Sequence, residues 1–198
     1  MKRPSRDNIY QTPQATSPFR FDEKVAAVFP DMIQRSVPGY ELIINGIQQL
    51  ATKHVKDNTR CYDLGCSLGA ASLAMSQGIQ ASGCEVIAVD NSSAMIERCQ
   101  LFVESYHHTT PITTTLSDIA EVTIDNASMV VLNFTLQFIP MNLRQSIINS
   151  IYKGLNTGGL LVLSEKIKAE DEHIDRTLID LYHDFKRANG YSELEISQ

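Results

Sequence analysis

The chain has 198 residues, a length typical of one domain whose core is stable without disulfides or metal ions. Its formal net charge is −6 and it has no cluster of lysines and arginines, which argues against direct binding of a nucleic-acid backbone. The sequence contains no run of about 18 apolar residues and no signal-peptide core, so no membrane association is expected. Four isolated cysteines, none in a C-x-x-C pair or at zinc spacing with histidine, indicate buried free thiols, no metal site and a cytoplasmic location.

The N-terminal part of the chain divides into a polar arm and a helical cover. Residues 1–20 contain three prolines and no apolar periodicity, which is typical of a flexible arm. Residues 21–55 predict a short helix from Asp22 that Pro30 interrupts, a second short helix over 31–36 and a longer amphipathic helix from Tyr40. We expect this segment to cover the glycine-containing turn at Gly65.

From residue 60 onward, short apolar runs alternate with amphipathic segments. The pattern predicts strands at 60–64, 85–89, 112–116, 129–132 and 159–163, and helices at 70–78, 94–106, 143–155 and 171–188. Three of the strands are nearly continuous apolar runs, which is typical of parallel strands covered on both faces. The prediction is one α/β domain over 21–198, with a mostly parallel Rossmann-like sheet and helices on both faces.

The segment 62–72 reads Y-D-L-G-C-S-L-G-A-A-S, a strand, a glycine turn and the start of a helix. Gly65 permits a turn with no Cβ in the way, and Gly69 lets the next helix pack close to the sheet. We expect the N–H groups of this turn to face a ligand. The G-x-x-x-G spacing is not the dinucleotide fingerprint, and the turn lacks the lysine of a phosphate-binding loop. By itself the segment fits equally well a turn that binds nothing.

The first four predicted strands end at polar side chains, namely Asp63, Asp90, Asp118 and Asn133. Strand ends of a parallel sheet line its ligand crevice. Asp90 follows Gly65 by 25 residues, an interval suited to a carboxylate that binds a ribose diol. Asp118 and the Ile119 N–H can contact an adenine, and Asn133 lies nearer the reacting end. Helix-cap, loop and turn roles are the alternatives for Asp90, Asp118 and Asn133. The acidic set favours a cationic nucleoside such as S-adenosylmethionine (SAM).

Two sets of motifs carry a resemblance to known families. D-L-G-C-S-L-G, V-I-A-V-D and L-S-D-I resemble the first, second and adenine-loop motifs of class I SAM-dependent methyltransferases. Longer segments at 21–40, 62–70, 90–99, 126–138 and 183–198 resemble the carboxy-S-adenosyl-L-methionine synthase family, and the similarity spans nearly everything from Phe21 onward. That family converts SAM and prephenate to carboxy-SAM and phenylpyruvate. A second enzyme uses carboxy-SAM to build the carboxymethoxy (5-oxyacetyl) group on a tRNA wobble uridine.

The resemblance implies a set of ligand-binding positions and a mechanism. The positions are Tyr40, Gly65, Cys66, Ser67, Asp90, Asn91, Asp118, Ile119 and Asn133; for Tyr40 a core position is the alternative. In the implied mechanism, hydroxide that leaves prephenate takes a methyl proton of SAM, and the resulting ylide captures the CO2. The protein then needs no base of its own. The resemblance also implies a homodimer and a functional link to a tRNA carboxymethyltransferase, without direct binding of nucleic acid.

The chain departs from the family at its ends. Residues 1–20 show no match, and the resemblance places an arginine for the product carboxylate and the last two strands of the sheet beyond Gln198. We therefore expect this chain to lack them and not to be fully active alone. Arg35 is a candidate contact for a substrate carboxylate, with a surface position or pairing to Asp31 as the alternative. His183 is expected to be structural.

Two other functions remain open on the sequence alone. The first is an ordinary SAM-dependent methyltransferase that acts on a small molecule. The second is a non-catalytic protein that binds the carboxylated cofactor for the tRNA-modifying enzyme. The mass of the product, or the absence of turnover, distinguishes them.

Overall fold

The computed structural model describes residues 6–11 and 20–197. The chain forms two compact units: the described residues up to Tyr40 together with those from Ile167 onward, and the segment Glu41–Lys166. This division is finer than the single domain over 21–198 that the sequence predicted. No helix in the described part of the chain is both long and apolar enough to cross a bilayer.

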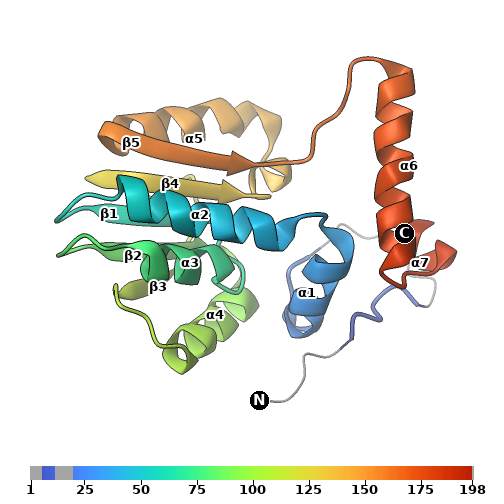
Figure 1. Cartoon of the computed structure of the whole chain (residues 1–198), viewed down its shortest axis with the longest axis horizontal. Helices are drawn as coiled ribbons and strands as arrows, with labels where there is room; N and C mark the ends of the chain where they lie inside the picture. The colour runs from blue at the N-terminus through green and yellow to red at the C-terminus, as the bar shows by residue number, and fades with distance from the viewer. Residues whose placement is uncertain (1–5, 12–19, 198) are drawn as a thin grey trace. The chain divides into compact units, whose positions relative to one another are not determined.

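The first unit contains three helices: α1 Glu23–Ser36, α6 Glu172–Ala188 and α7 Glu193–Ser197 (Figure 1). The prediction of two short helices on either side of Pro30 is wrong, because α1 continues through this proline. Asp22 caps its first turn by accepting a hydrogen bond from the Val25 N–H at 3.0 Å. Buried side chains both before and after Pro30 hold the helix in place, which offsets the backbone hydrogen bond that proline cannot make.

Part of the predicted N-terminal arm also packs into this unit. Asp7 is buried, its N–H donates to Asp31 Oδ2 at 2.8 Å, and its carboxylate accepts the Tyr191 hydroxyl at 2.5 Å. Residues 6–11 are thus tied to both α1 and the C-terminal segment, while the rest of the predicted arm, 1–5 and 12–19, lies outside the described residues. The helix α7, which the sequence reading missed, begins with a reciprocal capping box between Ser192 and Glu195.

The second unit is built on a five-stranded parallel sheet with the order β3-β2-β1-β4-β5 (Figure 1). The strands are β1 Arg60–Leu64, β2 Glu85–Asp90, β3 Ile112–Leu116, β4 Ala127–Asn133 and β5 Leu155–Ser164. The five predicted strands are all present, with β4 and β5 longer than expected. The strand order reverses between β1 and β4, and this is the position where open parallel sheets bind ligands, at the carboxyl ends of the strands.

Helices cover both faces of this sheet, as the sequence predicted. They are α2 Tyr40–His54, α3 Ala70–Gly78, α4 Ser93–Ser105 and α5 Met141–Gly154, with a 3-10 turn, η1 Leu136–Phe138, that was not predicted. In β4, Met129 and Val131 pack with α2 and α3, whereas Val130 and Leu132 pack with α5 on the opposite face. Because both faces of β4 are buried, its sequence is a continuous apolar run rather than an alternating one.

Candidate functional site

The turn after β1 contains three residues with left-handed backbone conformations: Gly65 at φ 82°, Ser67 at φ 48° and Gly69 at φ 82°. A Cβ on Gly65 would collide with the side chain of Thr135, which follows β4. A Cβ on Gly69 would lie 2.7 Å from the Cys99 sulfur on α4. Gly65 therefore permits close approach of the loop after β4, and Gly69 permits close approach of α4 rather than of the sheet.

The N–H groups of this turn are used inside the fold. Those of Gly65 and Cys66 both donate to the Val89 carbonyl at 2.8 Å, and that of Ser67 donates to Asp90 Oδ2 at 2.9 Å. The expectation that N–H groups of the turn face a ligand is therefore wrong for these three groups, and a ligand contact by the residues themselves stays a prediction. The end of β2 lies beside the turn and supplies acceptors for them, since buried backbone donors rarely stay unpaired.

Asp90 links two loops at the carboxyl edge of the sheet. Besides Ser67, it receives the Ser92 N–H on Oδ1 at 2.9 Å, and its carbonyl accepts the Ser117 N–H at 3.0 Å. Burial raises the pKa of its carboxyl, against the lowering effect of the Ser92 and Ser67 N–H groups. Each carboxylate oxygen has a second lone pair, so Asp90 can brace the loops and still accept hydrogen bonds from two hydroxyls.

Asp63, at the end of β1, is fully buried and accepts the Ser72 hydroxyl of α3 at 2.6 Å. Burial raises the pKa of this carboxyl to about 6, although the hydrogen bonds from Ser72 oppose the shift. The nearby Asp90 carboxylate adds to it. Two acidic groups in a desolvated position suit a neighbouring cation better than a phosphate.

The raised pKa of Asp63 makes a prediction about stability. The native state binds the proton of the Asp63 carboxyl more tightly than the unfolded chain does. Protonated Asp63 therefore stabilises the native state below about pH 4, and this stabilisation is lost as the pH rises through about 6. Between pH 4 and 7 we expect the free energy of unfolding of the parent to fall by up to about 3 kcal/mol because of this group. Asp63→Asn cannot ionise, so its free energy of unfolding should lack this fall. Urea denaturation of both proteins across this range measures the difference. Parallel pH profiles would contradict the prediction.

The loop after β4 carries an unsatisfied polar atom. Asn133 Oδ1 is buried and has no hydrogen-bond partner among the residues that the structure describes. The next residue, Phe134, has a positive φ of 58°, and the Thr135 side chain lies against Gly65. A buried amide oxygen without a donor fits a ligand that brings one, such as an ammonium group. This atom is the observation that best supports a ligand at the β1–β4 edge.

The remaining predicted positions of the second unit lie at the edge formed by β2 and β3. Asp118 is exposed, and its Oδ1 accepts the Ala120 N–H at 2.9 Å. Ile119 is buried in the cluster that contains Tyr62 and Val89, and Asn91 is exposed beside Asp90. The exposed carboxylate of Asp118 can accept a hydrogen bond from the amine of an adenine, while the neighbouring apolar residue packs against the flat ring.

Cys66 lies in the turn, and its thiol contacts that of Cys99 on α4. This contact and burial raise the pKa of Cys66, so its thiol stays protonated. All four cysteines are free and buried, as the sequence predicted. Among the described residues, no three metal-ligating side chains converge.

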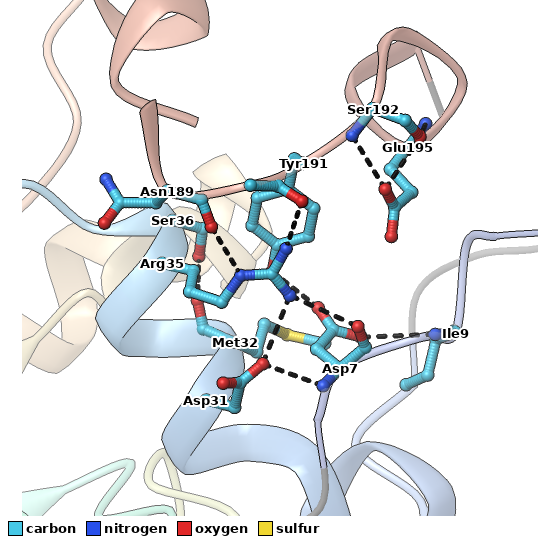
Figure 2. Close-up of polar contacts among 11 residues, drawn as sticks. Asp7, Ile9, Asp31, Met32, Arg35, Ser36, Asn189, Tyr191, Ser192 and Glu195 are labelled. Carbon is cyan, nitrogen blue, oxygen red and sulfur yellow. Dashed lines mark hydrogen bonds and ion pairs between the residues drawn. The ribbon is translucent and has the colours of Figure 1, made fainter. Parts of the chain in front are cut away.

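Two candidate residues belong to the first unit. Tyr40 is the half-buried first residue of α2. Arg35 is buried and pairs with Asp31 at 3.2 Å, which was the alternative considered from the sequence (Figure 2). Its other donors bond to backbone carbonyls of the same unit. A ligand role for either residue stays a prediction.

The sequence reading missed Ser72, Thr135 and Glu165 as partners of this edge. The Leu136 N–H donates to Glu165 Oε1 at 2.5 Å, directly after β5. The rule that polar residues follow the strands applies to Glu165 as well, because it follows the fifth predicted strand. Nothing in the local sequence signals the contact of Thr135 with Gly65.

Comparison with known proteins identifies the family. Residues 62–159 match the family model described as a methyltransferase domain. The carboxy-S-adenosyl-L-methionine synthase of Vibrio parahaemolyticus is 58% identical over 193 residues, covering 97% of this chain and 79% of that protein. The enzyme of the same name from Pseudoalteromonas translucida is 55% identical, covering 98% of this chain and 80% of that protein. The chain belongs to the carboxy-S-adenosyl-L-methionine synthase family.

A solved structure from Methanococcus maripaludis, described as a SAM-dependent methyltransferase, supports the fold of this family member. It superposes with a TM-score of 0.59 at 18% identity, covering 89% of this chain and 81% of that one. The Rossmann-like class I methyltransferase fold predicted from the sequence is thereby confirmed.

Proposed function

We propose that this chain is a transferase that makes carboxy-SAM and phenylpyruvate from SAM and prephenate. The proposal rests on sequence identity of 55% and 58%, over nearly the whole chain, to proteins named carboxy-S-adenosyl-L-methionine synthase. The site is compatible with it, because the strand ends carry two carboxylates, whose negative charge favours a cationic ligand, and one unsatisfied amide oxygen that can accept a hydrogen bond.

In this proposal the residues of the second unit bind and orient SAM. Asp90 accepts the two ribose hydroxyls, and Asp118 with the Ile119 N–H contacts the adenine. Asn133 Oδ1 accepts a hydrogen bond from the ligand's ammonium group, and the negative charge of Asp63 and Asp90 favours the sulfonium. Gly65, Cys66, Ser67 and Asn91 complete the proposed contacts of this unit, and the contact of Tyr40 is proposed from the family resemblance alone. Gly65, Cys66 and Ser67 act through the shape of the turn, since their N–H groups bond within the fold.

The proposed chemistry balances without an enzymic base. Prephenate breaks its bonds to the ring carboxylate and the ring hydroxyl, releases CO2 and hydroxide, and becomes phenylpyruvate. The hydroxide takes one proton from the SAM methyl group and leaves as water. The ylide carbon forms a bond to the CO2 carbon, which gives carboxy-SAM. The protein contributes by holding the reactants together, stabilising charge and excluding water.

The wider biological role is also a proposal. By its family, the chain would supply carboxy-SAM to a tRNA carboxymethyltransferase for the carboxymethoxy modification of a wobble uridine, and would act as a homodimer.

The product's mass tests the proposed function. The purified protein is incubated with SAM, with and without prephenate, and the nucleoside products are analysed by mass spectrometry. We expect a nucleoside that carries one carboxyl group more than SAM, formed only when prephenate is present. Loss of a methyl group from SAM to a small acceptor would instead indicate an ordinary methyltransferase. Tight binding of carboxy-SAM without turnover would indicate a non-catalytic carrier.

A further inference from the structure

The loop after β4 is held at both ends by charged side chains. At its start, Glu165 accepts the Leu136 N–H, and the Thr135 and Gln137 N–H groups also face this carboxylate. At its end, Arg144 of α5 donates to the Ile139 carbonyl at 2.9 Å and to the Gln137 carbonyl at 3.4 Å. The negative group thus lies at the N–H end of η1 and the positive group at its carbonyl end, which is the favourable arrangement for both.

Glu165 is a partly buried acid whose carboxylate accepts hydrogen bonds from the loop after β4. Burial raises its pKa, and the three N–H groups and Arg144 oppose that rise. Placing a carboxylate here is therefore unfavourable unless the loop supplies donors to it. The preceding residue adds to the connection, because the Ser164 carbonyl accepts the Phe134 N–H at 2.8 Å. The end of β5 thereby holds three consecutive residues of the loop, Phe134 to Leu136.

The residues held in this way are those that shape the candidate site. Phe134 has a left-handed backbone, which for a residue with a large side chain is unfavourable by about 1–3 kcal/mol and persists only when the surroundings impose it. Before it lies Asn133 with its unpartnered oxygen, and after it lies Thr135 against Gly65. If Phe134 relaxed, both neighbours would turn away from their present positions.

We propose that Glu165 is a positioning residue for SAM binding: it fixes the loop after β4 so that Asn133 presents its amide oxygen to the ligand. The inference rests on the proposed function for the identity of the ligand. Glu165 contacts loop N–H groups and acts on the ligand only through Asn133 and Thr135.

The first test compares Glu165→Ala and Glu165→Gln with the parent chain. Glutamine keeps one acceptor oxygen for the loop N–H groups, so it should retain most of the affinity that alanine loses. We expect Glu165→Ala to weaken SAM binding about tenfold in calorimetry, and Glu165→Gln to weaken it less than about threefold. Glu104→Ala, at an exposed position on α4, is the matched control and should leave the affinity unchanged.

A double-mutant cycle separates positioning from general loss of stability. In an Asn133→Ala background, Glu165→Ala should weaken binding by less than about twofold more, because the oxygen that it positions is already gone. Fully additive effects of the two changes would overturn the proposal. Equal affinity of the parent and Glu165→Ala would do the same.

A readout without ligand distinguishes failure of this inference from failure of the proposed function. Hydrogen exchange of the amides at 134–139 in the free protein should be at least about tenfold faster in Glu165→Ala than in the parent. Unchanged exchange would overturn the role of Glu165 whatever the ligand is. If exchange is faster in Glu165→Ala but the parent chain does not bind SAM, the role of Glu165 in the loop holds and the proposed function fails. If Glu165→Ala does not fold, Glu165→Asp carries the same comparison, because its shorter side chain withdraws the carboxylate from the loop N–H groups.

Discussion

Arg35→Ala is expected to lower the stability of the first unit by about 3–5 kcal/mol, because it removes a buried guanidinium with several charge-assisted hydrogen bonds and its partly buried ion pair with Asp31. The guanidinium donates to the Asn189 carbonyl at 2.8 Å, the Gly190 carbonyl at 2.7 Å and the Asp7 carbonyl at 3.2 Å, besides its pair with Asp31 (Figure 2). Its Cζ also lies 4.0 Å from the centre of the Tyr191 ring. Alanine would leave the three carbonyls without this donor and the Asp31 charge without its partner.

Hydrogen exchange of peptides from α1 and from 189–191 in the full chain measures this loss directly. Arg187→Ala is the matched control, because Arg187 lies in the same unit, is exposed and pairs with the exposed Asp184 and Glu193. Exposed ion pairs contribute little, so this variant should behave like the parent. Equal protection in Arg35→Ala and the parent would show that the buried contacts do not hold the unit together.

Arg35→Lys addresses the substrate role that the sequence suggested for this residue. Lysine keeps the charge but not the forked donors that reach three backbone carbonyls, so exchange in the first unit should again increase. A role in binding a substrate carboxylate would appear separately, as slower turnover with prephenate at unchanged SAM affinity. If affinity and turnover both stay within about twofold of the parent, Arg35 has a structural role only.

Asp90→Ala is expected to weaken SAM binding at least about tenfold while the fold stays intact. Charge-assisted hydrogen bonds contribute about 1.5–3 kcal/mol each, and alanine removes the proposed acceptor for both ribose hydroxyls. The structure adds a second reason, because the Ser67 and Ser92 N–H groups lose their acceptor in the same step. The two loops that the carboxylate joins would then be held less firmly.

Calorimetry with SAM measures the affinity, and circular dichroism checks the fold. Glu97→Ala, at an exposed position on α4, is the control for loss of a nearby negative charge. Asp90→Asn retains one acceptor oxygen and should bind with an affinity between that of the parent and that of Asp90→Ala. Affinity equal to the parent in Asp90→Ala would remove this residue from the site.

The sequence by itself predicted the sheet and its helices. The strands β1 and β3 and the helix α3 have the predicted bounds, because apolar runs, caps and glycines act on a few neighbouring residues. The edge that carries Asp63, Asp90, Asp118 and Asn133 could be predicted for the same reason: in a parallel sheet, all strand ends meet at one edge. Pro30 was misjudged because the local rule for proline ignores the packing that keeps α1 continuous.

Only the tertiary structure decided which atoms near the site remain available. The Gly65 and Cys66 N–H groups bond to Val89, a partner that becomes close only when β1 and β2 pair. Thr135 reaches Gly65 for the same reason, because β4 lies next to β1 although the two are far apart in sequence. Arg35 and Asn189 are separated by 154 residues, and their contact defines a unit that no local pattern indicates. Such contacts depend on how the elements pack, and this information is not contained in any short stretch of sequence.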